Sequence, residues 1–136
     1  MAKQKKPTGL TRAQLAVMDL IWELGEASVS DVWRELSKHR TIARNTVQTT
    51  LVRLEEKGFL KHRTVGNAFR YAATAPRKKT VKQMLRSLLN GAFQGSTEGL
   101  MMALLEEAPP SDDELKRIRK KLNQLPKQAQ SKNREK

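Results

Sequence analysis

Apolar residues recur at helical spacing in the first part of the chain, and the first such stretch predicts a helix that begins after Thr11. Thr11 and Gln14 have the spacing of a capping box. Gly25 predicts the end of the helix, because glycine accepts the left-handed conformation found there. The expected apolar face consists of Leu15, Met18, Ile21 and Trp22.

A second, shorter helix is predicted after a brief extended piece at residues 28–30. Ser30 is the expected N-cap, since Asp31 behind it places a carboxylate in the first turn, where the helix dipole favours it. The expected apolar stripe of this helix consists of Val32, Trp33 and Leu36.

The third stretch predicts a helix from about Ala43 to Lys57, with Gly58 ending it. At the angular step of an α-helix, one side of this segment is apolar and the opposite side is small, polar and basic. The apolar side consists of Ala43, Val47, Leu51 and Leu54. The opposite side consists of Asn45, Thr46, Gln48, Thr49, Val52, Arg53 and Glu56.

Two β-compatible runs follow, at residues 59–65 and 68–72, and Gly66-Asn67 separates them. A two-residue connection that begins with glycine predicts a hairpin with a type II′ turn. Alternation predicts inward-facing side chains at Leu60, Phe69 and Tyr71 and outward-facing ones at Lys61, Arg63 and Arg70. Three short helices followed by a basic hairpin predict a mainly α fold with a small β wing, a winged helix-turn-helix domain over residues 10–75.

The rest of the chain predicts a linker at residues 75–79 and a helical region over residues 76–125. Three glycines, Gly91, Gly95 and Gly99, predict a break within it. The strongly apolar run that follows is ended by Pro109-Pro110, because proline cannot continue a helix. A second capping box, Ser111 with Glu114, opens a last helix whose apolar positions are Leu115, Ile118, Leu122 and Leu125.

The helical region is too short and too rich in glycine to form a good core by itself, so an intertwined homodimer is expected. A self-contained bundle is the alternative. A two-fold protein would match a palindromic site with half-sites one or two helical turns apart. The expected dimerisation residues are Met84, Leu85, Leu88, Leu100, Met101, Leu104, Leu105, Leu115, Ile118 and Leu122.

The chain has 27 Lys and Arg residues against 14 Asp and Glu, a net charge of +13. Such an excess suits a polyanion, because each cation that reaches a phosphate releases a counterion. Residues 1–9 and 126–136 are basic and expected to be disordered. No apolar run approaches the roughly 20 residues of a membrane helix or the pattern of a signal peptide. Together with the lack of cysteine, this predicts a cytoplasmic protein without a membrane partner.

A helix with a polar, basic face fits the major groove of double-stranded DNA, with its first residues at the base edges. The base-edge candidates are Asn45, Thr46, Gln48 and Thr49, and Arg44 and Arg53 flank them as backbone contacts. On the hairpin, the candidates for the adjoining backbone or minor groove are Arg63, Asn67 and Arg70. Two alternatives remain, an ordinary solvated helix face and a winged-helix module that binds proteins without reading DNA.

The sequence predicts no catalytic residues, no metal site and no cofactor. Neighbouring carboxylates such as Glu55-Glu56 point apart on a helix, and His39 and His62 lie in no metal-binding motif. Trp22 and Trp33 could stack on bases, but their places on apolar stripes favour packing in the core. An enzyme is therefore the least supported class.

These residues resemble the penicillinase-repressor family of the BlaI, MecI and CopY type over about residues 10–125. The residues that carry the resemblance are Leu10-Thr11-x-x-Gln14-x-x-Val17-Met18-x-x-Ile21-Trp22, Asp31-Val32-x-x-Glu35-Leu36, Asn45-Thr46-Val47-Gln48-Thr49-x-Leu51-x-Arg53-Leu54-x-x-Lys57-Gly58 and Gly66-x-x-x-x-Tyr71. The resemblance implies a homodimeric bacterial repressor that occludes an operator. It also implies that the helix from Ala43 enters the major groove, that residues 59–72 form the wing and that C-terminal helices dimerise.

The resemblance leaves the signal that releases DNA open. Members that respond to β-lactams are cleaved between an Asn and a Phe in the dimerisation region, and a regulatory protease is then a partner. The nearest counterpart here, Met102-Ala103-Leu104-Leu105, lacks that pair. Copper-responsive members carry a cysteine-rich tail, whereas this chain has no cysteine. The sign of regulation, repression or activation, is equally open from the residues alone.

Overall fold

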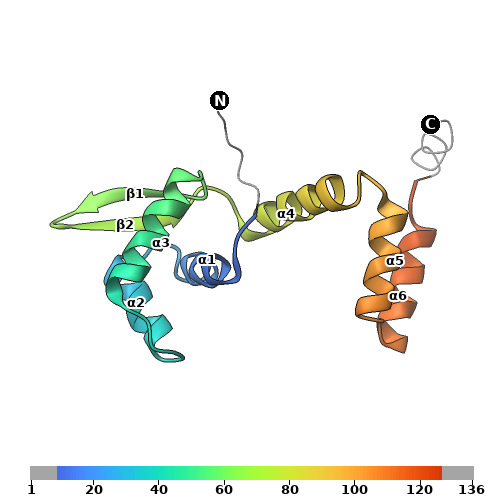
Figure 1. Cartoon of the computed structure of the whole chain (residues 1–136), viewed down its shortest axis with the longest axis horizontal. Coiled ribbons are helices and arrows are strands. Elements are labelled where there is room, and N and C mark those ends of the chain that lie inside the picture. Colours follow the sequence, from blue (N-terminus) through green and yellow to red (C-terminus); the bar gives the residue numbers. More distant parts are fainter. Residues whose placement is uncertain (1–8, 127–136) are drawn as a thin grey trace. The chain divides into compact units, whose positions relative to one another are not determined.

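The computed structural model describes residues 9–126, which form two compact units, residues 9–92 and 93–126 (Figure 1). The first unit contains α1 (Arg12–Leu24), α2 (Val29–Ser37), α3 (Arg44–Glu56), the strands β1 (Leu60–Val65) and β2 (Ala68–Ala73), and α4 (Arg77–Ala92). The second unit contains α5 (Thr97–Glu107) and α6 (Asp112–Asn123). The expectations of disorder at residues 1–8 and 127–136 lie outside the described residues.

The first unit encloses an apolar core to which its first three helices and the hairpin contribute. Figure 1 shows α3 lying between α2 and the hairpin, and α3 contacts both as well as α1. The core residues are Val17, Met18, Ile21, Ala27, Val32, Leu36, Val47, Leu51, Leu54, Phe59, Leu60 and Tyr71. The apolar sides expected for the three helices therefore supply most of the core, and the predicted winged helix-turn-helix fold, mainly α with a small β wing, is confirmed.

The start of α2 differs from the expectation, because Ser28 and not Ser30 is the N-cap. Ser28 Oγ accepts from the backbone N–H of Asp31 at 3.1 Å, and Asp31 Oδ2 accepts from the backbone N–H of Ser28 at 3.1 Å. This reciprocal pair needs a spacing of three residues, which Ser28 has and Ser30 lacks. The extended piece expected at residues 28–30 is also wrong, since the extended pairing lies at Ala27, opposite Tyr71.

We expect Ser28→Ala to lower the free energy of unfolding by about 1 kcal/mol, because it leaves the first turn of α2 without its cap. Ser37→Ala removes the same hydroxyl from the exposed last residue of α2 and is expected to change this free energy by less than about 0.5 kcal/mol. Urea denaturation of both variants measures the difference. Equal losses for the two variants would contradict the cap assignment.

Two aromatic side chains expected to face the core lie outside it. Trp33 is exposed on α2, and its indole N–H donates to the backbone oxygen of Ile42 at 2.9 Å. Phe69 is exposed on β2 and stacks on His62 with 4.0 Å between ring centroids. The buried core ends at Leu60 and Tyr71 on the hairpin, and Phe69 lies beyond it against His62 of the neighbouring strand.

The hairpin itself is as predicted. The strands pair antiparallel from Leu60 opposite Ala73 to Val65 opposite Ala68, which leaves Gly66 and Asn67 as the two-residue turn. Gly66 has φ 61°, and no positive φ occurs at Asn67, a combination that fits type II′ and not type I′.

Residues 75–79 do not form the expected linker, because α4 already begins at Arg77 and its start is held against α1. The indole N–H of Trp22 donates to the backbone oxygen of Ala75 at 2.9 Å. Arg77 Nε donates to Asp19 Oδ1 at 2.8 Å, and its guanidinium lies 6.0 Å from the Trp22 ring centroid. The first compact unit thus continues through α4, while the dimerisation role of residues 76–125 stays a prediction.

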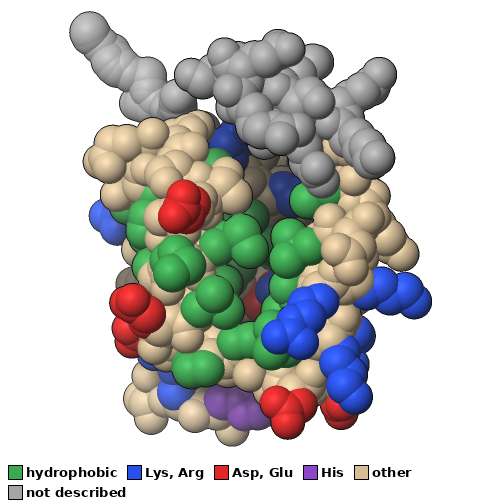
Figure 2. Space-filling view, turned by 90° about the vertical axis from the view of Figure 1, so that its right-hand side faces the viewer, with side chains coloured by type: hydrophobic (Ala, Val, Ile, Leu, Met, Phe, Trp, Pro, Cys, Tyr) green, Lys and Arg blue, Asp and Glu red, His purple; other side chains and the backbone are tan. Residues whose placement is uncertain are grey.

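The break expected from the glycines lies at the start of the second unit. Gln94 and Gly95 adopt φ values of 49° and 80° between α4 and α5, and Ser111 with Glu114 forms the predicted capping box of α6. Leu125 lies beyond the end of α6, although it was expected on that helix. No residue among 93–126 is buried. Figure 2, seen from the side of α5 and α6, shows hydrophobic side chains gathered at the surface.

Candidate nucleic-acid interface

The outer side of α3 presents a continuous polar surface above a closed core. Val47, Leu51 and Leu54 on its inner side have no exposed surface, which fixes the rotation of the helix. The side chains predicted to meet DNA from this helix are therefore all exposed: Arg44, Asn45, Thr46, Gln48, Thr49 and Arg53. Val52 and Glu56 lie with Asn45, Gln48, Thr49 and Arg53 around one shallow depression. Val52 is 41% exposed and adds an apolar contact of the kind that suits a thymine methyl group.

The start of α3 is held by α2 rather than by a cap of its own. Ala43 occupies the N-cap position and makes no side-chain hydrogen bond. The backbone of the preceding Ile42 accepts the indole N–H of Trp33, and Arg44 Nη2 donates to Ser30 Oγ at 3.1 Å. Trp33 and Ser30 thus set the position at which α3 begins.

The wing is joined to the loop between α1 and α2. Ala27 and Tyr71 exchange two backbone hydrogen bonds, 2.9 Å from the N–H of Ala27 and 2.8 Å from the N–H of Tyr71. This pairing brings Glu26, beside Ala27, next to Arg70, beside Tyr71. Arg63 lies opposite Arg70 in the strand register, so both wing arginines reach the same carboxylate.

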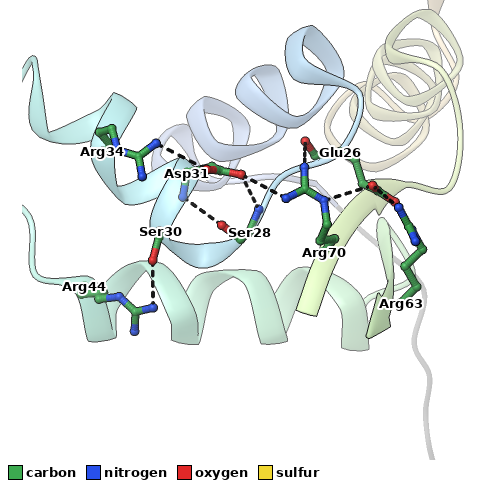
Figure 3. A network of polar contacts seen from close by, with 8 residues as sticks. All are labelled: Glu26, Ser28, Ser30, Asp31, Arg34, Arg44, Arg63 and Arg70. Atoms are coloured by element: carbon green, nitrogen blue, oxygen red, sulfur yellow. Dashed lines mark hydrogen bonds and ion pairs between the residues drawn. The ribbon is translucent and has the colours of Figure 1, made fainter. Parts of the chain in front are cut away.

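Figure 3 shows the resulting network of polar side chains. Arg63 donates to Glu26 through Nε at 2.6 Å and through Nη2 at 2.9 Å. Arg70 donates to the Glu26 carboxylate through Nε at 3.1 Å and to the Glu26 backbone oxygen through Nη2 at 3.3 Å. Its Nη1 lies 3.5 Å from Asp31 Oδ2. The cap of α2, the loop before it and the wing are therefore connected by charged groups.

This network keeps both carboxylates ionised. Hydrogen bonds from Arg63 and Arg70 lower the pKa of Glu26 from its ordinary 4.5 to about 2. Hydrogen bonds from Ser28, together with the charge of Arg70, lower the pKa of Asp31. A lowered carboxyl pKa stabilises the fold above the ordinary pKa, so the Glu26 contribution is present above about pH 4.5 and is lost as the pH falls toward 2.

Sequence reasoning missed the acidic partners of the wing and the environment of His62. Glu26 lies 37 residues from Arg63, so no local pattern links them. His62 Nδ1 lies 2.7 Å from Glu55 Oε1, and the ring stacks on Phe69, which ties the wing to the end of α3. Strand alternation does place His62, Phe69 and Tyr71 on one face of the hairpin, and that signal could have found the cluster.

The residues predicted to dimerise all retain exposed surface on their own elements. On α4, Met84 is half-buried and Leu85 and Leu88 are exposed. In the second unit, Leu100 and Leu115 are half-buried, whereas the exposed members are Met101, Leu104, Leu105, Ile118 and Leu122. Each unit thus leaves an apolar helix face open to solvent, which is the arrangement expected of surfaces that are covered by another chain.

Comparison with known families decides the identity. The family model described as penicillinase repressor matches residues 10–124, nearly all of the described chain. The chain belongs to the penicillinase repressor family. It is accordingly a DNA-binding transcriptional repressor, and the resemblance noted from its motifs is confirmed.

Individual relatives agree with this assignment. The penicillinase repressor of Bacillus licheniformis is 31% identical over 114 residues, which cover 84% of this chain and 89% of that protein. The methicillin resistance regulatory protein MecI of Mammaliicoccus sciuri is 25% identical over 84% of this chain and 93% of its own. The crystal structure of the YusO protein from Bacillus subtilis aligns over 88% of this chain and 78% of its own with a TM-score of 0.53. At 18% identity, this last likeness concerns the fold alone.

None of the helices within residues 9–126 of this repressor is both long and apolar enough to span a membrane.

Proposed function

We propose that this repressor acts as a homodimer that occludes a palindromic operator in double-stranded DNA. The observation that carries the proposal is the exposed polar side of α3, which stands above a closed core with the wing attached beside it. Such a helix fits the major groove, and a wing next to it reaches the adjoining backbone.

Within this proposal the side chains of α3 divide by their position. Asn45, Thr46, Gln48 and Thr49 belong to the first two turns and read base edges, since amide side chains pair with adenine and threonine methyls contact thymine. Arg44 and Arg53, at the two ends of the helix, contact phosphates and supply salt-sensitive affinity. On the wing, Arg63 and Asn67 reach the flanking backbone or minor groove.

The open apolar faces support the homodimer. The second unit has no buried residue among 93–126, so its helices lack a core of their own. In a homodimer, the apolar faces of a second chain cover those of the first. The dimer also doubles the DNA contacts, because an isologous pair presents two recognition helices related by a two-fold axis. We further propose that the protein works in the cytoplasm. Cleavage by a regulatory protease stays a prediction from the resemblance.

A gel-shift titration against the DNA upstream of its own gene tests this function. We expect a saturating shift with two chains per half-site pair, resistant to an excess of unrelated duplex at near-physiological salt. Equal binding to every duplex, or no binding at that salt concentration, would contradict the proposal.

We expect Arg53→Ala to weaken binding to operator and unrelated duplex alike and to flatten the plot of log affinity against log salt by about one. Arg53 is exposed in the last turn of α3, one turn beyond the last predicted base contact, so the substitution removes a phosphate contact and no sequence information. Arg53→Lys, which keeps the charge, should retain the slope. An unchanged slope in Arg53→Ala would remove Arg53 from the phosphate contacts.

A further inference from the structure

The two wing arginines lie opposite each other in the hairpin but differ in how much of each guanidinium remains available. Arg63 uses one edge, Nε and Nη2, for the Glu26 carboxylate. Its Nη1 has no partner among residues 9–126, and its side chain is 64% exposed. A guanidinium has five N–H donors, so Arg63 keeps a second edge that points outward and fits a phosphate.

Arg70 has no such edge to offer. Its Nε bonds the Glu26 carboxylate, its Nη2 bonds the Glu26 backbone oxygen, and its Nη1 pairs with Asp31. All three nitrogens are thus engaged within the first unit, and the side chain is only 34% exposed. A phosphate would therefore have to compete for Arg70 with two carboxylates and a backbone carbonyl.

The contacts of Arg70 also connect the wing to the loop before α2 and to the start of α2. Glu26 precedes the Ala27–Tyr71 pairing, and Asp31 belongs to the capping box of α2 (Figure 3). Arg70 therefore fixes the wing to the same corner from which α2 starts, and α2 in turn holds the start of α3 through Ser30 and Trp33.

We propose that Arg63 is the wing's phosphate contact, and that Arg70 is a positioning residue that sets the angle of the wing through Glu26 and Asp31 without touching DNA. This division of roles rests on the proposed operator binding and deepens it. Glu26 serves both residues, because it orients the exposed edge of Arg63 while it holds Arg70 in place.

Lysine substitutions separate the two roles, because a lysine keeps a single charge for a phosphate but cannot make several directed contacts at once. The probe is a fluorescein-labelled duplex from the upstream region that the wild-type protein protects, and anisotropy is recorded over a series of salt concentrations. Arg63→Lys is expected to bind within about twofold of the wild type. Arg70→Lys is expected to bind about two- to thirtyfold more weakly at every salt concentration, with an unchanged slope.

Neutral variants give the complementary result. Arg63→Gln is expected to flatten the salt slope by about one, whereas Arg70→Gln lowers affinity without changing the slope. In the Arg70→Gln background, Arg63→Gln should cost less than it does alone, because a displaced wing has already lost part of that contact. Lys120→Gln, which removes one exposed positive charge on α6, should change neither affinity nor slope. Thermal unfolding confirms that each variant is folded before it is titrated.

Three results would overturn the division of roles: a slope that falls in Arg70→Gln as it does in Arg63→Gln, full affinity in Arg70→Lys, or an unchanged slope in Arg63→Gln. Each of them leaves the operator binding of the wild type intact and is therefore distinct from a failure of the proposed function. A wild-type protein that selects no duplex would overturn both. If Arg70→Gln does not fold, the lysine pair still decides the question.

Discussion

Leu104→Glu is expected to convert the protein into monomers and to lower its affinity for a complete operator by about a hundredfold or more. Leu104 is 57% exposed on α5 within a unit that has no buried residue among 93–126. A carboxylate there would have to be desolvated against the apolar face of a second copy. Without the dimer, the two recognition helices bind independently and the gain from effective concentration is lost. Sedimentation velocity and operator titration measure the two effects.

The control for charge is Lys120→Gln, which shifts the net charge by the same amount from an exposed position on α6. It should remain dimeric and bind normally. Affinity for an isolated half-site should be nearly the same in Leu104→Glu and the wild type, since the recognition helix is untouched. A dimeric Leu104→Glu protein would show that the α5 face is not the contact between copies.

Leu51→Ala is expected to lower the free energy of unfolding of the first unit by about 2–5 kcal/mol. Leu51 has no exposed surface and lies at the centre of the inner side of α3, so the truncation leaves a cavity that the surrounding helices fill only in part. For a domain of this size the midpoint of thermal unfolding should fall by at least about 8 °C. Differential scanning calorimetry of the wild type and the variant measures it.

Val52→Ala is the matched control, one position along the same helix. Val52 is 41% exposed on the outer side, and its truncation is expected to change the free energy of unfolding by less than about 0.5 kcal/mol. Similar losses in both variants would mean that α3 is rotated about its axis relative to the described structure, and the whole set of base contacts would then be wrong.

Most features that depend on residues within four positions of each other could be predicted from the sequence, although the cap of α2 was placed at Ser30 instead of Ser28. The capping boxes at Thr11 and Ser111, the stop at Gly25 and the turn at Gly66 each rest on such local chemistry. The inner side of α3 was also predictable, because a buried stripe at helical spacing has one orientation that hides it.

Features that depend on distant partners could not be predicted. Trp33 and Phe69 stand at positions of the correct periodicity, but periodicity gives the side of an element and not whether another element covers it. The donation from Trp22 to the backbone of Ala75, 53 residues away, turns an expected linker into the anchored start of α4. Likewise, residue type alone assigns Arg63 and Arg70 to one role, whereas in the folded chain only Arg70 also contacts the Glu26 backbone oxygen and Asp31.

The lack of a buried core among residues 93–126 also has a consequence for dosage. If those helices are stable only when paired, the dimer is the form that binds DNA. By mass action, its concentration at low expression rises with the square of the chain concentration. Halving the supply of chains would then reduce the pairs about fourfold, so repression would fall more steeply with the rate of synthesis than it would for a repressor that acts as a monomer. The genes under such a regulator would respond to a decline in its abundance more steeply than in direct proportion.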